Sequence, residues 1–196
     1  YGKIIPKNFL NLTKKGFINV HASILPKWRG AAPIQRSIMN LDDETGISIM
    51  KIVEELDSGP ISNSYKIKLD RNFNAEEISD KLSLLAAEKI SDNIDDIFQE
   101  KVKFIDQDHS KATYAKKINK KEGQINWGEK ASNIIGKINA LIPIPGGFFN
   151  FDGERYKILK AEIGNGIGKL GEIVSDKLEI ACSNNQSIKV LEIQRE

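Results

Sequence analysis

The sequence has little of the residues from which disulfide frameworks and metal centres are built. Its 196 residues include one cysteine, Cys182, and two histidines. A single cysteine excludes an internal disulfide and a cysteine-rich zinc site, and it is typical of proteins from a reducing compartment. Two histidines also disfavour a metal cluster built from histidine, so no metal is expected.

Long apolar runs are absent as well. No segment approaches the roughly 20 apolar residues that cross a bilayer, and the first residues lack the apolar core of a secretory signal. We therefore expect a cytoplasmic protein without a membrane span. The composition, 40% hydrophobic and 29% charged, is that of a globular protein with one or two domains. Because the chain opens with Tyr1 and enters a patterned stretch at once, we interpret it as an N-terminally truncated piece of a longer protein.

Charge is segregated along the chain although the net charge is only +2. Residues 1–41 carry seven basic residues and no acidic one, whereas residues 42–108 carry eight basic and seventeen acidic residues. Residues 109–196 carry fourteen basic and ten acidic residues. Such blocks are compatible either with solvated faces or with a polyanionic partner.

The first hundred residues alternate strands and helices, which predicts an α/β architecture. Strands are predicted over residues 17–20, 45–53 and 61–67, and helices over residues 32–39 and from Asn74 onward. The apolar run 17–20 is typical of a buried strand in a parallel sheet. Asn74 and Glu77 have the spacing of a capping box. The helix that follows has an apolar stripe at helical spacing, made of Ile78, Leu82, Leu85, Ala86 and Ile90.

The pattern changes after about residue 104. A helix with one apolar face is predicted from Ala131 to Ile142, and all that follows reads as short strands. Asp152-Gly153 predicts a tight hairpin turn. Further strands are expected over residues 171–174, 178–182 and 187–193, and this spacing suggests a small closed barrel. We predict a first domain over residues 1–106, a linker over 107–112 and a second domain over 113–196.

Asn19 and His21 are the first candidates for catalysis. They lie two residues apart at the end of a predicted strand, so both side chains point to the same side of the sheet. An amide donor beside an imidazole can polarise a carbonyl group and handle a proton. Asp57, in a Gly-Pro loop after a later strand, can orient or support His21 as a general acid or base. The alternatives are a structural asparagine, an exposed histidine and an aspartate that only makes a turn.

Other motifs in the sequence also have simple structural explanations. The loop over residues 23–30 mixes apolar, basic and aromatic side chains and is compatible with a ligand wall or with core packing. Residues 166–171 match the Gly-x-Gly-x-x-Gly string of dinucleotide sites, but they lead into a strand rather than a helix, so no phosphate loop is expected. We interpret Cys182 as strand packing and His109 as linker surface.

The strand end and its loop resemble a known family. Residues 19–26 read Asn-Val-His-Ala-Ser-Ile-Leu-Pro, which resembles the Asn-x-His-x-Ser-Leu-Leu-Pro signature of the formyltetrahydrofolate-dependent formyltransferases, with Ile24 as a departure. Four further segments are similar to the members of that family that act on methionyl-tRNA. They are Trp-Arg-Gly-Ala-Ala-Pro-Ile-Gln-Arg at 28–36, Leu-Asp-Ser-Gly at 56–59, Thr-Tyr-Ala-Lys-Lys-Ile at 113–118 and Ile-Asn-Trp at 125–127.

The resemblance implies a fold and a reaction. The fold is the C-terminal portion of a doubly wound, Rossmann-like catalytic domain, followed by a small OB-like β-barrel that binds tRNA. The reaction is transfer of a formyl group from 10-formyltetrahydrofolate to the α-amino group of initiator methionyl-tRNA, for translation initiation. The family catalyses it without a metal, and we expect a monomer.

The resemblance also assigns roles to residues. The catalytic set is Asn19, His21 and Asp57. The folate-binding set is Ser23, Ile24, Leu25 and Pro26. The set that binds the aminoacyl-tRNA is Trp28, Arg29, Gly30, Lys116, Lys117, Lys120 and Lys121.

Two alternative functions stay open at this point. Another folate-dependent formyltransferase would use an amino sugar or glycinamide ribonucleotide as acceptor. A non-catalytic RNA-binding protein would use only the barrel and the lysines, including Lys111, to follow phosphates.

Overall fold

The computed structural model describes residues 5–10 and 12–196, so the opening residues 1–4 and Asn11 lie outside it. The chain divides into two compact units. The first comprises residues 1–36, 43–69 and 78–117, and the second comprises residues 37–42, 70–77 and 118–196. The boundaries predicted around residues 107–112 stay predictions.

A three-stranded sheet forms the centre of the first unit, with β1 (Ile18–His21), β3 (Glu44–Lys51) and β4 (Ile61–Lys68) in the order β1-β3-β4. All three strands were predicted. Residues Thr45–Met50 of β3 are all buried, as its central place requires, whereas exposed and half-buried residues alternate along the second half of β4.

The segment near residue 17, predicted as a buried strand typical of a parallel sheet, forms β1, and its neighbour among the described residues is not parallel to it. β1 pairs with β3 in antiparallel register, from Ile18 opposite Lys51 to His21 opposite Ser48. Its residues Ile18–Val20 are only half-buried. An apolar run indicates burial, but it does not specify the direction of the neighbouring strand.

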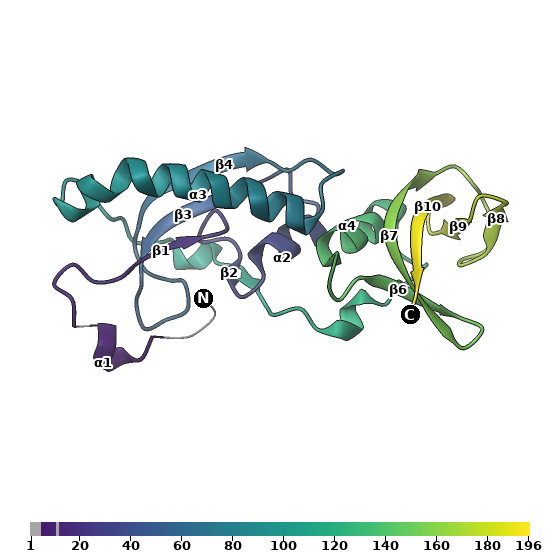
Figure 1. Ribbon diagram of the computed structural model, residues 1–196, viewed down its shortest axis with the longest axis horizontal. Coiled ribbons are helices and arrows are strands. Elements are labelled where there is room, and N and C mark those ends of the chain that lie inside the picture. The colour runs from purple at the N-terminus through teal and green to yellow at the C-terminus, as the bar shows by residue number, and fades with distance from the viewer. Residues whose placement is uncertain (1–4, 11) are drawn as a thin grey trace. The chain divides into compact units, whose positions relative to one another are not determined.

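Most residues of two helices belong to the first unit. α2 (Pro33–Met39) lies within the predicted range of residues 32–39, and the long α3 (Ala75–Phe98) follows β4 (Figure 1). The capping box at the start of α3 is present, because Asn74 Oδ1 accepts from the Glu77 N–H at 3.0 Å and Glu77 Oε2 accepts from the Asn74 N–H at 2.8 Å. Asn93 of α3 donates to the Tyr65 hydroxyl of β4 at 2.9 Å, which ties this helix to the sheet.

Several short elements were not predicted. They are α1 (Lys7–Leu10), the 3-10 helices η1 (His109–Lys111) and η2 (Lys120–Gly123), and the two-residue strands β2 (Arg29–Gly30) and β5 (Tyr114–Ala115). β2 and β5 pair with each other in parallel. Elements this short contain too few residues for a periodic pattern, so sequence periodicity does not reveal them.

The second unit is built from α4 (Ala131–Leu141) and a five-stranded antiparallel sheet in the order β6-β7-β10-β9-β8. The strands are β6 (Gly147–Phe151), β7 (Glu154–Gly164), β8 (Ile173–Ser175), β9 (Glu179–Cys182) and β10 (Gln186–Arg195). The predicted turn at Asp152-Gly153 joins β6 and β7, with φ values of 51° and 80° that suit a type I′ turn. Closure of this sheet into a barrel stays a prediction.

One apolar core joins the α4 helix to the sheet of the second unit. Ile134 and Ile138 on α4, Ile158 on β7 and Ile188 on β10 are fully buried in it. Among the described residues, no helix is long and apolar enough to span a membrane.

Candidate active site

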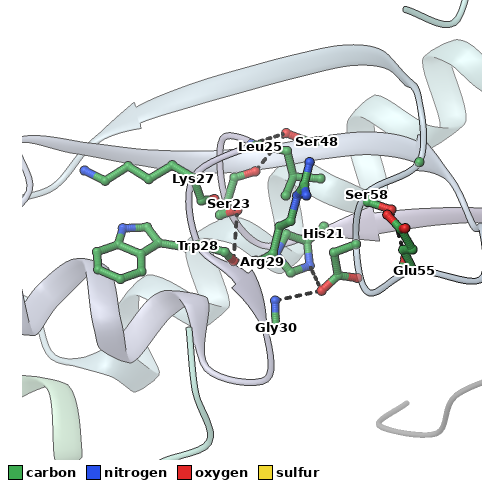
Figure 2. Close-up of polar contacts among 12 residues, drawn as sticks. His21, Ser23, Leu25, Lys27, Trp28, Arg29, Gly30, Ser48, Glu55 and Ser58 are labelled. Atoms are coloured by element: carbon green, nitrogen blue, oxygen red, sulfur yellow. Dashed lines mark hydrogen bonds and ion pairs between the residues drawn. The ribbon is translucent and has the colours of Figure 1, made fainter. Parts of the chain in front are cut away.

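His21 is the last residue of β1, and its side chain is 7% exposed. Its Nε2 lies 2.9 Å from the carbonyl oxygen of Trp28, and its Nδ1 lies 3.7 Å from Asp57 Oδ2 (Figure 2). Because a carbonyl oxygen can only accept, Nε2 is the nitrogen that donates in this arrangement. Nδ1 is the nitrogen that faces the carboxylate.

Asp57 is held in a tight loop between β3 and β4. Its φ is 47°, in the left-handed region that aspartate tolerates better than most residues do. Its Oδ2 accepts a hydrogen bond from the Gly30 N–H at 2.8 Å. Two residues later, a Cβ on Gly59 would lie 1.9 Å from the Lys51 carbonyl oxygen, so only glycine fits there. The Asp57 carboxylate thus has a defined position opposite His21.

Asn19 shares its sheet face with His21, as predicted. The two residues lie opposite Met50 and Ser48 of β3, with one residue between them. The Asn19 side chain is half-buried, and within the described part of the chain its amide has no hydrogen-bond partner. Its donors are therefore available to a ligand.

The loop after β1 is rigidly held by its own hydrogen bonds. Ser23 is buried and donates to the Lys27 carbonyl at 2.6 Å, while Ser48 Oγ donates to the Ser23 carbonyl at 2.8 Å and accepts from the Leu25 N–H at 3.1 Å. Leu25 is buried at 6% exposure, while Ile24 and Pro26 are half-buried. Trp28 has a left-handed φ of 63°, and its N–H donates to Thr113 Oγ1 at 2.9 Å. These contacts fix the carbonyl to which His21 donates.

Arg29 does not lie on the surface. It is 3% exposed, and its guanidinium donates to Gln107 Oε1 through Nε at 3.0 Å and through a terminal nitrogen at 2.7 Å. His109 was interpreted as linker surface and is exposed, but its Nδ1 lies 3.4 Å from two Arg29 nitrogens. Gly30 adopts a φ of 117°, and a Cβ there would lie 2.8 Å from the Ala115 carbonyl oxygen. The conformation at position 30 thus requires glycine.

The lysines selected from the sequence occupy two places. Lys116 and Lys117 follow β5 in the first unit, where Arg36 Nε donates to the Lys116 carbonyl at 3.1 Å. Lys120 and Lys121 are the first two residues of η2 in the second unit. They lie between Asn119 and Glu122, the two residues of its capping box. All four side chains are exposed, and none forms an ion pair with another described residue. Lys111 differs, since it pairs with Asp108 at 2.8 Å and helps lower the pKa of that carboxyl to about 2, together with the Ser110 hydroxyl.

In the glycine-rich segment over residues 166–171, two backbone N–H groups already donate to carboxylates of the same chain. The Gly166 N–H donates to Glu179 Oε1 at 2.6 Å, and the Lys169 N–H donates to Glu172 Oε2 at 2.7 Å. Cys182 lies in the core of the second unit, and burial raises the pKa of its thiol. Among the residues that the structure describes, no cluster of three potential metal ligands occurs.

Sequence reasoning missed Gln107, which the structure places beside the candidate site. Its amide group joins Arg29 to the Asp57 loop, across sequence separations of 78 and 50 residues. A single glutamine in a stretch without periodicity carries no signal of burial, so no pattern in the sequence would have selected it.

Two family models match the chain. The model described as Formyl transferase matches residues 1–94, and the model described as Formyl transferase, C-terminal domain matches residues 117–196. A methionyl-tRNA formyltransferase from Pelagibacter ubique (strain HTCC1062) is 64% identical over all 196 residues. The chain spans 63% of the length of that relative.

Solved structures show the same fold. A methionyl-tRNA formyltransferase from Clostridium thermocellum matches with a TM-score of 0.65 at 25% identity, over 85% of this chain and 70% of that one. An N-formyltransferase from Helicobacter canadensis, in complex with folinic acid and dTDP-3-aminofucose, matches with a TM-score of 0.75 at 20% identity, over 92% of this chain and 66% of that one. The predicted fold class, a Rossmann-like portion followed by a C-terminal domain, is confirmed.

Proposed function

The chain belongs to the formyl transferase family, and on this premise we propose that it transfers a formyl group from 10-formyltetrahydrofolate to the α-amino group of initiator methionyl-tRNA. The 64% identity to a methionyl-tRNA formyltransferase supports this acceptor over an amino sugar or glycinamide ribonucleotide. The folinic acid in the Helicobacter canadensis enzyme supports a folate as the donor. The observation that carries the proposal is the meeting of His21 and Asp57 on the sheet face that also holds Asn19, whose amide has no hydrogen-bond partner among the described residues.

The proposed reaction begins with attack of the neutral α-amine on the formyl carbon. A C–N bond forms, and the formyl oxygen becomes anionic in the tetrahedral intermediate. The Asn19 amide donates a hydrogen bond to that oxygen. A single donor of this kind contributes about 10²–10³ in rate in other acyl-transfer sites.

His21 handles the proton in this scheme. The imidazole accepts the proton that the attacking nitrogen loses, and the same proton then passes to the folate nitrogen as the bond from the formyl carbon to that nitrogen breaks. Asp57 stabilises the imidazolium between these two steps. The products are formylmethionyl-tRNA and tetrahydrofolate, and no redox change occurs.

Binding roles follow from the positions of the loop residues. We assign Ser23, Ile24, Leu25 and Pro26 to the wall that borders the folate, and Trp28 and Gly30 to the aminoacyl end of the tRNA. Since Arg29 is buried against Gln107, we propose that it holds the conformation of this loop rather than contacting the tRNA. Lys116, Lys117, Lys120 and Lys121 would contact tRNA phosphates, which bind cations without reading bases.

The cellular setting of the proposed reaction follows from its acceptor. Initiator tRNA is used for translation initiation in the cytoplasm, so we place the protein there, as a monomer. The catalytic portion would occupy residues 1–106 and an OB-like, tRNA-binding domain residues 113–196, with residues 107–112 between them.

A chimera tests the proposal. Residues 1–196 replace the matching 63% of the Pelagibacter ubique relative, and formyl transfer from 10-formyltetrahydrofolate is measured with two acceptors. We expect transfer to methionyl-initiator tRNA and none to a dTDP-3-amino sugar. Transfer to the sugar alone would overturn the choice of acceptor, and transfer to neither would overturn the proposed activity.

A further inference from the structure

Gln107 is a buried amide, 7% exposed, whose hydrogen-bonding capacity is fully used. Its Oε1 accepts twice from the Arg29 guanidinium, at 3.0 and 2.7 Å. Its Nε2 donates to the carbonyl oxygens of Asp57 at 2.9 Å and of Gly59 at 2.8 Å. All four hydrogen-bonding positions of the amide are thus occupied.

Chemistry allows only one orientation of this amide. A guanidinium can only donate and carbonyl oxygens can only accept, so Oε1 must face Arg29 and the NH₂ group must face the Asp57 loop. Arg29 therefore sets the direction in which Gln107 donates. The three residues form a directed chain of hydrogen bonds that ends on the backbone of the proposed catalytic carboxylate.

Asp57 needs such support because its backbone is in an uncommon conformation, with φ at 47°. Gln107 holds the backbone of the loop, and the Gly30 N–H donates to the Asp57 carboxylate at 2.8 Å. Gly30 directly follows Arg29 in β2. The Arg29-Gly30 pair thus acts on Asp57 twice, once through Gln107 and once directly.

We propose that Gln107, oriented by Arg29, is a positioning residue that places the Asp57 carboxylate against His21. The inference rests on the proposed function for its kinetic consequence, whereas its structural consequence is independent of any activity. Gln107 touches neither His21 nor, in this proposal, the reacting atoms.

The isosteric change Gln107→Glu separates the two ends of the amide. A carboxylate keeps both acceptor bonds to Arg29, but it loses both donor bonds and turns an oxygen toward the carbonyls of Asp57 and Gly59. The matched control is Asn93→Asp in the same unit. It also removes an amide with two donor bonds, to the Tyr65 hydroxyl at 2.9 Å and to the Lys89 carbonyl at 2.7 Å, but it has no contact with the Asp57 loop.

The structural readout is the exchange rate of the Gly30 amide proton, followed by NMR in the 196-residue chain. Gln107→Glu is expected to accelerate this exchange, because a displaced Asp57 no longer accepts the bond. Asn93→Asp is expected to leave it unchanged. Arg29→Lys, which loses the bidentate grip but keeps the charge, provides a second variant with a smaller change in the same direction.

The kinetic readout uses the chimera. Gln107→Glu is expected to lower kcat about 10–100-fold through misplacement of Asp57, with KM for both substrates nearly unchanged. The positioning role would be overturned if Gln107→Glu lowered kcat no more than Asn93→Asp does. It would also be overturned if the exchange rate of the Gly30 amide proton were unchanged in Gln107→Glu or, should that variant not fold, in Arg29→Lys. If the unsubstituted chimera transferred no formyl group, the proposed function would fail, while the exchange measurement would still decide whether Gln107 positions Asp57.

Discussion

Gly30 shows how much of the site depends on a single residue. Its N–H donates to Asp57, its φ of 117° is accessible mainly to glycine, and a Cβ added to it would lie 2.8 Å from the Ala115 carbonyl oxygen. A side chain at this position would disturb the pairing of β2, the hydrogen bond to Asp57, and the loop after β1 whose Trp28 carbonyl accepts from His21.

Replacing Gly30 with alanine is therefore expected to destabilise the fold. The new Cβ would lie 2.8 Å from the Ala115 carbonyl oxygen, so that oxygen must move. The side chain would also be strained by the φ of 117°. We expect a loss of about 1–3 kcal/mol in the free energy of unfolding, measured by urea denaturation. The control is Gly16→Ala, where φ is 74° but nothing lies within 4 Å of the new Cβ. Equal losses in the two variants would show that the Ala115 contact has no effect.

The proposed catalytic residues could be selected from the sequence because each belongs to a short local motif. Asn19 and His21 stand two residues apart at a strand end, and Asp57 stands in a Gly-Pro loop. Gln107 and the burial of Arg29 could not be foreseen. Their hydrogen bonds join segments 48 to 78 residues apart, and a polar residue buried by long-range contacts leaves no periodic pattern.

Among the structural elements, those with local chemical signals were the predictable ones. The capping box before α3 and the Asp152-Gly153 turn each arise within four residues, so propensity and spacing specify them. The direction of β1 relative to β3 depends on the path of the intervening chain, and the apolar run at residues 17–20, which is typical of a parallel sheet, did not specify it. The pairing of β2 with β5 joins residues more than eighty positions apart and was not predicted at all.

A carboxylate holds the loop between β7 and β8. Glu179 of β9 accepts from the buried Ser187 hydroxyl and the Gly166 N–H, each at 2.6 Å, and these hydrogen bonds lower the pKa of Glu179. A carboxyl whose pKa is lower in the folded state stabilises the fold above its unfolded pKa, near 4.3. That contribution is lost as the pH falls through the lowered pKa of the folded state.

Glu179→Gln should therefore reduce the pH dependence of stability in the acidic range. The free energy of unfolding is expected to fall less between pH 6 and acidic pH in this variant than in the parent chain, because the substituted side chain does not titrate. Urea denaturation at a series of pH values measures the difference. Glu192→Gln, on the exposed part of β10, is the control, and an identical acid-induced loss in parent and Glu179→Gln would contradict the account.

At the level of the whole molecule, the lysines supply the charge that the proposed polyanionic substrate needs. Lys116 and Lys117 lie in one compact unit, and Lys120 and Lys121 in the other. Because carboxylates among the described residues do not neutralise them, their charges are available to phosphates. The segregation of charge along the sequence was compatible with a polyanionic partner or with solvated faces, and it did not distinguish these lysines from those that the fold pairs internally.

Replacing these four lysines with alanine in the chimera is expected to weaken binding of initiator tRNA and to flatten its salt dependence. Each lost phosphate contact should reduce the slope of the logarithm of the binding constant against the logarithm of the salt concentration by about 0.9, where the lysine faces a duplex. The control replaces four lysines that form ion pairs with glutamates, namely Lys7, Lys66, Lys89 and Lys189. Because both variants lose the same net charge, equal slopes in the two would contradict specific phosphate contacts.

The most direct test of the central claim is the formyl-transfer rate of the chimera after Asn19→Ala and, separately, after His21→Ala. The loss of the oxyanion donor is expected to lower the rate about 10²–10³-fold. The loss of the general acid and base is expected to lower it about 10²–10⁴-fold. Unchanged circular dichroism spectra would show that both variants fold. Rates near that of the parent chimera in both variants would contradict the assignment of Asn19 and His21 as catalytic residues.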